Sequence, residues 1–209
     1  MKALLIIGAS GHGRVVADAA LTMGVWDDVG FVDDNPALTE VMGLKVVGTG
    51  ANLATLVRSY CAAAVAIGNA AARLRYLDRC AALGLELPVI VHRNAVVSKF
   101  ASLGPGTVVF AQSAINAGAS LGRGCIVNTG ATVDHDCILN DAVHVSPGAH
   151  VAGEVHIGAR SWIGIGASIR QCVRIGSDVT VGAGAAVVCD VASNVTVVGV
   201  PARVMPGKS

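Results

Sequence analysis

The feature that most constrains the fold of this chain is a six-residue period in its second half. From Val97 to Val187 every sixth residue, sixteen in all, is valine, isoleucine or leucine. The residue four places later in each hexad, from Ala101 to Val191, is small or is valine. Such a short repeat is typical of a β-helical solenoid, in which each repeat stacks on its neighbours and buries a continuous core.

The repeat resembles that of the left-handed parallel β-helix of hexapeptide acyltransferases. In that fold one hexad forms one face of a triangular prism and three hexads complete a coil, so sixteen hexads give a little over five coils. The aliphatic residues are expected to fill the axis, and the small residues are expected to fit the tight corners. Cys125 and Cys137 stand at corner positions, so we interpret them as packing residues and not as nucleophiles.

The first 93 residues follow another pattern, in which short apolar runs alternate with helical stretches. The predicted strands are 3–7, 29–32, 45–47, 63–67 and 89–91, and the predicted helices are 14–23, 51–60 and 70–83. This alternation indicates βαβ units around a parallel sheet. We therefore expect a Rossmann-like α/β domain over 1–93, too short for both halves of a dinucleotide fold, followed by an all-β β-helix over 94–209.

Composition excludes several classes of function. The net charge is +1 and neither half is strongly basic, so nucleic acid is not an expected partner. No apolar stretch approaches the roughly 18 residues of a spanning helix, so no membrane partner is expected. The six cysteines form no C-x-x-C pair, and the N-terminus does not read as a signal peptide. We therefore expect a cytoplasmic location.

The solenoid register separates most of the histidines. Residues 18 apart stack on one face, whereas residues 6 apart lie on neighbouring faces and diverge. His144, His150 and His156 are 6 apart, so within one chain they cannot share a metal ion, and no metal site is expected. A zinc hydratase, with its metal held across a subunit interface, stays open as an alternative.

His135 has a different setting, because Asp136 follows it directly and Gly153 lies 18 residues further on. A carboxylate beside an imidazole can fix its tautomer and raise its basicity. We expect Gly153 to leave open space over the imidazole, where a ligand could lie. The alternative is a polar loop at a solvent-exposed corner.

A second column joins Pro147, Ile165 and Ala183, spaced by 18, and reaches Pro201 if the register persists past Val187. These small to medium apolar residues predict a groove parallel to the axis that could hold a long thin ligand. Plain surface between charged neighbours is the alternative.

Six short motifs in the two halves resemble those of sugar acyltransferases of the sialic-acid O-acetyltransferase type, a family that includes UDP-N-acetylbacillosamine N-acetyltransferase. The motifs are IGASGHG at 7–13, Asp33-Asp34, Ile67-Gly68-Asn69, His135-Asp136-Cys137, HVSP at 144–147 and GVPAR at 199–203. The resemblance covers almost the whole chain.

The resemblance implies an acetyl-CoA-dependent acetyltransferase in which His135 is the catalytic base and Asp136 is its partner. It also implies that His144 of a neighbouring chain contacts the thioester carbonyl of acetyl-CoA, and that Ile165 and Ala183 line the pantetheine channel.

In the N-terminal domain the resemblance implies a nucleotide-sugar site. Its members are Ser10, Gly11, His12 and Gly68, with Asp33 and Asp34 near the uridine. The segment Gly8–Gly11 follows a predicted strand and opens a predicted helix, so its N–H groups can face a diphosphate. Its G-x-x-G-x-G spacing differs from the dinucleotide fingerprint, so no nicotinamide cofactor is expected. For the two aspartates, a helix-side cap before Asn35-Pro36 is the alternative.

The expected reaction is direct transfer of acetyl from acetyl-CoA to the 4-amino group of a nucleotide-linked 4-amino-4,6-dideoxy-sugar, with UDP as the nucleotide. An O-acetyltransferase acting on a sugar hydroxyl, such as that of sialic acid, is one alternative, and a non-enzymatic trimeric scaffold is another. His144 lies nine residues, or half a coil, from His135, so the two are apart in one subunit. Flat apolar faces are usually covered by a partner, and we expect a homotrimer with active sites between chains.

Overall fold

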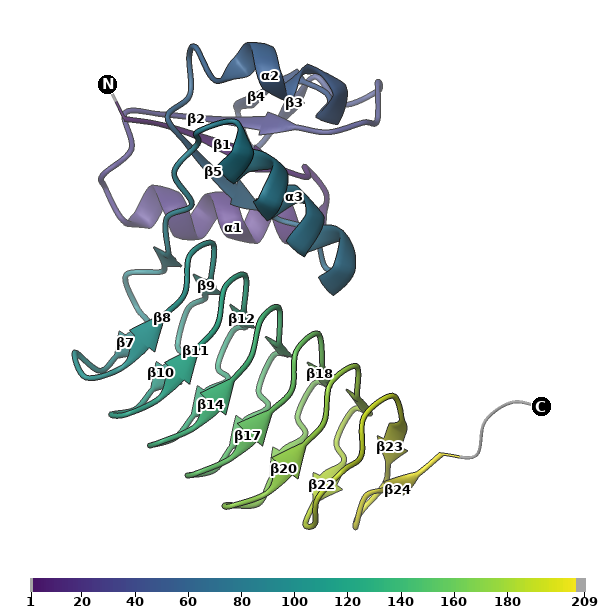
Figure 1. The fold of residues 1–209 in the computed structure, drawn as a ribbon. Helices are drawn as coiled ribbons and strands as arrows, with labels where there is room; N and C mark the ends of the chain where they lie inside the picture. The colour runs from purple at the N-terminus through teal and green to yellow at the C-terminus, as the bar shows by residue number, and fades with distance from the viewer. Residues whose placement is uncertain (1, 206–209) are drawn as a thin grey trace. The chain divides into compact units, whose positions relative to one another are not determined.

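The computed structural model describes residues 2–205 of the chain, which forms two compact units. The first unit ends at Arg93 and the second begins at Asn94. In Figure 1 the first unit mixes helices with strands, and the second is a stack of coils.

The N-terminal unit is built on a five-stranded sheet with the order β3-β4-β2-β1-β5. Four of the strands run parallel, and β3 joins β4 in a hairpin. The strands are β1 (Ala3–Ile7), β2 (Asp28–Val32), β3 (Glu40–Val41), β4 (Leu44–Gly48) and β5 (Ala62–Val65). The helices are α1 (Gly11–Thr22), the 3-10 turn η1 (Gly50–Asn52), α2 (Leu53–Leu56) and α3 (Ala70–Ala82).

Two predicted elements differ from the structure. The strand expected at 89–91 forms as β6 (Ile90–Val91), but it is not part of the five-stranded sheet. The helix expected over 51–60 is only η1 followed by one turn of α2. Leu53 is the one fully buried side chain of α2, so little apolar surface favours a longer helix, and the chain turns to bring Tyr60 into the core.

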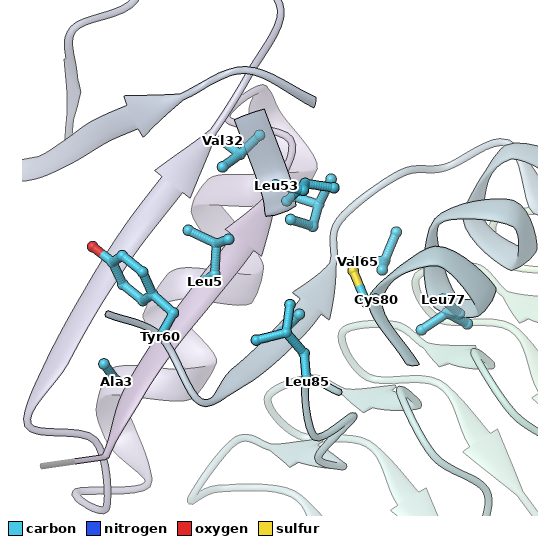
Figure 2. Close-up of a cluster of buried hydrophobic side chains, with 11 residues drawn as sticks. Ala3, Leu5, Val32, Leu53, Tyr60, Val65, Leu77, Cys80 and Leu85 are labelled. Carbon is cyan, nitrogen blue, oxygen red and sulfur yellow. The ribbon is translucent and has the colours of Figure 1, made fainter. Parts of the chain in front are cut away.

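The core of this unit alternates along β1. Ala3, Leu5 and Ile7 face one cluster of buried side chains together with Leu53 and Leu77. Figure 2 shows residues from β1, β2, β5, α2 and α3 converging on this cluster. Complete burial of one leucine stabilises a fold by roughly 1.5–3 kcal/mol, so this contact fixes the helices against the sheet and thereby positions the strand ends.

The C-terminal unit is a parallel β-helix whose two-residue strands form three faces. Face I contains β7 (Val96–Val97), β10 (Ala114–Ile115), β13 (Thr132–Val133), β16 (His150–Val151), β19 (Ser168–Ile169) and β22 (Ala186–Val187). Face II contains β8 (Ser102–Leu103), β11 (Ser120–Leu121), β14 (Ile138–Leu139), β17 (His156–Ile157) and β20 (Arg174–Ile175). Face III contains β9 (Val108–Val109), β12 (Ile126–Val127), β15 (His144–Val145), β18 (Trp162–Ile163), β21 (Thr180–Val181), β23 (Thr196–Val198) and β24 (Arg203–Val204).

The strands pair with a spacing of 18 residues, as the hexads predict. The axial aliphatic residues from Val109 to Val187 are buried, and so are the corner cysteines Cys125 and Cys137. Burial raises the pKa of the Cys137 thiol, so the thiolate needed for a nucleophile is disfavoured. The expected fold class is therefore confirmed: an α/β unit is followed by a parallel β-helix of hexapeptide repeats.

The register changes after β22. Ile175 pairs with Val191, and Thr180 pairs with Thr196, so the last coil is two residues shorter than the others. The expectation that the corner row continues through Val191 was wrong, because Val191 pairs with the axial residue Ile175 instead. The expectation that Pro201 extends the column of Ala183 was wrong for the same reason.

Candidate functional site

The first candidate site is a cleft of about 280 Å³ in the N-terminal unit, at the ends of β1, β2 and β5. It is lined by Ile7, Gly8, Ser10, Val32, Asp33, Asp34, Gly50, Ala66, Ile67, Gly68 and Tyr76. Four residues predicted from the sequence meet here, namely Ser10, Asp33, Asp34 and Gly68. The other two, Gly11 and His12, are not among the described residues that line it.

Two glycines shape the loop that opens α1. Gly8 has φ +104, and a Cβ there would lie 2.9 Å from the carbonyl oxygen of Ala66. A Cβ on Gly13 would overlap the carbonyl of Gly8 and lie 3.5 Å from Phe31 Cε1. The helix can therefore begin directly after the strand, and its N-terminal N–H groups form an electropositive end suited to an anion.

The two aspartates of this cleft have different environments. Asp33 accepts backbone hydrogen bonds on both oxygens, from Ala9 N at 2.7 Å and from Asn35 N at 2.9 Å. Asp34 accepts one, from Gly50 N at 2.7 Å on Oδ1. Asp33 therefore holds the glycine-rich loop, whereas Asp34 keeps more capacity to accept from a ligand.

Tyr76 also lines the cleft, and sequence reasoning missed it. A Cβ on Gly50 would lie 2.6 Å from Tyr76 Oη and 3.3 Å from Asp34 Oδ1, so the hydroxyl and the carboxylate meet beside Gly50. The available signal was helical spacing, because Tyr76 lies three residues after Arg73 on the face of α3 that reaches Gly68.

His12 and Arg73 lie behind the cleft lining. Burial, followed by the charge of Arg73, lowers the pKa of His12 to about 4, so its imidazole is neutral near pH 7. Arg73 is buried, and its Nη1 donates to the carbonyls of Ile67 and Gly68, both at 2.8 Å. This arginine thus ties the β5–α3 loop to the helix.

The second candidate site lies at the corner of the β-helix between faces I and II, where His135 follows β13. Nδ1 of His135 lies 2.9 Å from Oδ2 of Asp136. A carboxylate only accepts, so the neutral imidazole carries its hydrogen on Nδ1 and leaves the lone pair on Nε2. The two side chains are 54% and 65% exposed, so a ligand can reach the imidazole.

Three carboxylates surround this imidazole. The hydrogen bond to Asp136 raises the pKa of His135 most, and the charges of Asp134, Asp136 and Glu154 add to the rise. Asp134 also accepts from His135 N at 2.7 Å and from Asn116 Nδ2 at 2.7 Å, and the bond from Asn116 lowers the pKa of Asp134 most. The pair is therefore more basic than an ordinary histidine and favours positive charge.

The space beside Gly153 is not open, in contrast to the expectation from the sequence. A Cβ on Gly153 would lie 2.5 Å from Nε2 and 2.6 Å from Cε1 of His135. The imidazole itself occupies this space, because the ring folds over the next coil.

His144 lies on face III, opposite the corner that carries His135. Its ring stacks on that of Trp162, one coil further on, with centroids 5.4 Å apart and planes 14° apart. Asn128 Nδ2 lies 3.1 Å from His144 Nε2, and Trp162 Nε1 donates to Ser146 Oγ. The structure therefore does not bring His144 and His135 together within one chain.

The column of Pro147, Ile165 and Ala183 forms as expected at the corner between faces III and I. Gly166 N donates to the carbonyl of Pro147 at 3.0 Å, and Gly184 N donates to that of Ile165 at 2.8 Å. Ile165 is 57% exposed, so the column offers an apolar strip beside His144.

The outward rows do not form the large apolar faces expected from the fold. The outward residues of face II are Ser102, Ser120, Ile138, His156 and Arg174, a mixed and largely polar row. His144, His150 and His156 lie on three different faces. Among residues 2–205 no group of three or more metal-ligating side chains is found, and no helix in that range is long and apolar enough to span a membrane.

Comparison with protein families matches both units. Residues 3–80 match the PglD N-terminal domain, and residues 154–188 match the bacterial transferase hexapeptide of six repeats. Comparison with curated proteins gives no significant match.

Solved structures match over the whole length. The acetyltransferase domain of PglB from Neisseria gonorrhoeae FA1090, in complex with acetyl coenzyme A, is 46% identical, with 98% of this chain and 99% of that chain covered and a TM-score of 0.95. A mutant of perosamine N-acetyltransferase from Caulobacter crescentus, in complex with CoA and GDP-perosamine, is 37% identical, with 99% and 98% covered and a TM-score of 0.95. WeeI from Acinetobacter baumannii AYE is 27% identical, with 98% and 100% covered and a TM-score of 0.88.

The α/β unit and the hexapeptide β-helix together define a hexapeptide-repeat transferase. With this degree of identity to PglB and to perosamine N-acetyltransferase, the chain belongs to the family of PglD-like sugar acyltransferases. This membership confirms the expected class of enzyme.

Proposed function

We propose that the protein moves acetyl from acetyl-CoA to the 4-amino group of a nucleotide-linked 4-amino-4,6-dideoxy-sugar, with His135 as general base. The observation that carries the proposal is the contact of 2.9 Å between His135 Nδ1 and Asp136 Oδ2 at an exposed corner of the β-helix. Two relatives support the donor and the acceptor class, since one is in complex with acetyl coenzyme A and the other with CoA and GDP-perosamine.

The reaction is a direct acyl transfer. The amine nitrogen forms a bond to the thioester carbon, Nε2 of His135 takes a proton from that nitrogen, and the carbon–sulfur bond breaks to release CoA thiolate. Asp136 stabilises the imidazolium that forms. General-base help of this kind contributes about 10²–10⁴-fold, and no covalent enzyme intermediate is needed.

The acidic surroundings of His135 favour an amine over a hydroxyl acceptor. Asp134, Asp136 and Glu154 stabilise positive charge at this corner, and a sugar ammonium brings such a charge, whereas a hydroxyl does not. This charge pattern supports N-acetylation over O-acetylation.

We propose a homotrimer in which each active site lies between two chains. His135 and the strip of His144 and Ile165 lie on different sides of one prism, so a site that contains both draws on two copies. In such a site His144 supplies a hydrogen-bond donor to the thioester oxygen, an interaction typically worth roughly 2.7–4 kcal/mol. Ile165 and Ala183 line the pantetheine.

The N-terminal cleft is proposed to hold the nucleotide, with UDP as the expected one. Ser10 and the N-terminus of α1 face the diphosphate, and Asp34 accepts from the ribose or the base. The described cysteines are all free thiols, which fits the proposed cytoplasmic location.

The test measures release of CoA thiol from acetyl-CoA. A UDP-4-amino-4,6-dideoxy-sugar, a GDP-linked amino sugar and free sialic acid are compared as acceptors, with His135→Ala as the control. We expect release with the UDP-linked amino sugar and its loss in His135→Ala. Release only with the GDP sugar would correct the nucleotide, and release only with sialic acid would establish an O-acetyltransferase. No release with any acceptor would favour a scaffold or, if zinc copurifies, a hydratase.

A further inference from the structure

Two glycines border the His135–Asp136 pair along the axis of the β-helix. Gly118 lies one coil before Asp136, and Gly153 lies one coil after His135. The coils are joined beside the pair by hydrogen bonds from Asp136 N to the carbonyl of Ala117 at 3.1 Å and from Glu154 N to the carbonyl of His135 at 2.9 Å. Each side chain of the pair therefore lies next to a position that lacks a Cβ.

The backbone does not explain the glycine at 153. Its φ is outside the left-handed region, and it is the only glycine at this place in the hexads from Lys99 to Ala183. Ala117 and Ala159 show that alanine fits the same place in other hexads. What a Cβ at 153 would meet is the imidazole of His135, with Nε2 at 2.5 Å, Cε1 at 2.6 Å and Cδ2 at 3.0 Å.

Backbone conformation does not explain the glycine at 118 either. Its φ is +77, but Gln112, Ala142 and Glu154 adopt a positive φ at the equivalent turns. A Cβ on Gly118 would overlap Oδ1 of Asp136 and lie 3.2 Å from its Cγ. The glycine is thus matched to the carboxylate and not to the turn.

We infer that Gly118 and Gly153 are positioning residues that make room, from opposite sides, for Asp136 and His135 to meet in a single geometry. The inference rests on the proposed function of His135 for its catalytic meaning, but not for the contact itself. Because both obstructed atoms are ends of side chains, an added methyl group displaces the side chain and leaves the coil intact.

The test uses Gly153→Ala and Gly118→Ala in the full-length protein, with Gly130→Ala as the matched control. Gly130 has φ +65 at a turn of the same β-helix, and a Cβ there meets nothing within 4 Å. The first readout is the titration of the His135 imidazole by NMR without substrate. The second is the steady-state rate of CoA release.

We expect the pKa of His135 to fall in both variants, because the hydrogen bond to Asp136 that raises it is lost, and to stay unchanged in Gly130→Ala. We expect kcat to fall about 10²-fold, the effect of misplacing a catalytic group by roughly 1 Å. If Gly153→Ala also lowers Tm, removing the ring with His135→Ala must restore it.

An unchanged titration of His135 in both variants would overturn the inference, and so would an equal shift in Gly130→Ala. If the titration shifts as expected while His135→Ala keeps full activity, the positioning role stands and the proposed role of His135 as base fails. The two claims are therefore tested separately.

Discussion

The ring of His144 stacks on the ring of Trp162 one coil further along face III, with centroids 5.4 Å apart and planes 14° apart. This stack fixes the imidazole on the face of the prism opposite the corner of His135. A site that uses both histidines must therefore form between two copies of the chain.

Subunit mixing tests this arrangement. In equal mixtures of His135→Ala and His144→Ala chains, random trimers rebuild about a quarter of the sites, since a site is intact only when each residue comes from the right neighbour. We expect CoA release near a quarter of the wild-type rate after exchange is verified by mass spectrometry.

Wild type mixed equally with the double variant is the control. It should keep about a quarter of the activity if sites lie between chains and about half if they lie within one. No recovery in the first mixture, with half retained in the second, would show that the site belongs to a single chain.

Asp136→Asn should separate basicity from binding. The hydrogen bond to Asp136 is the largest cause of the raised pKa of His135, so its weakening lowers that pKa toward the ordinary value. The rise of kcat/KM with pH should then occur at lower pH, and kcat should fall roughly 10²-fold, with the KM for acetyl-CoA almost unchanged. An inflection that stays in place would mean that Asp136 does not tune the base.

The two aspartates of the N-terminal cleft should respond differently to the same isosteric change. Asp33 uses both oxygens to accept backbone N–H groups, and asparagine has only one acceptor, so Asp33→Asn should destabilise the fold by about 1–3 kcal/mol. Asp34 uses one oxygen, so Asp34→Asn should leave Tm nearly unchanged and raise the KM for the nucleotide-sugar. Thermal unfolding and saturation kinetics on both variants check this, and the reverse pattern would exchange the two roles.

His12 should make the protein sensitive to mild acid. Its pKa is lowered from 6.5 to about 4 in the folded state, so the unfolded chain binds the proton first as pH falls. Stability from this group is complete above pH 6.5 and decreases toward pH 4, by on the order of 3 kcal/mol. Calorimetry from pH 7 to 4.5 should show a smaller loss for His12→Gln, and equal losses in the two proteins would refute this role.

The β-helix could be predicted from sequence because its period repeats an identical local environment at each hexad. Val109 and Val187 are both buried on the axis, and no knowledge of distant contacts is needed to place them. The change of register at Val191 could not be predicted in this way, since it depends on a coil two residues shorter than the rest.

The candidate sites were predicted only in part. The neighbours His135 and Asp136 are adjacent in sequence, so their contact was accessible. The bond from Ala9 N to Asp33 joins the ends of two strands, and the meeting of Tyr76 with Asp34 requires the packing of α3. Gly153 was correctly singled out, but whether its space holds a ligand or the imidazole depends on a side-chain conformation that the sequence does not encode locally.

The central claim is that His135, oriented by Asp136, removes the proton from the acceptor amine. It is tested most directly by measuring the pH dependence of kcat/KM and the NMR titration of the His135 imidazole in the same protein. The account predicts a kinetic inflection that coincides with the His135 titration above pH 6.5 and disappears in His135→Ala together with about 10²–10⁴-fold of the rate. An inflection that persists unchanged in His135→Ala would contradict it.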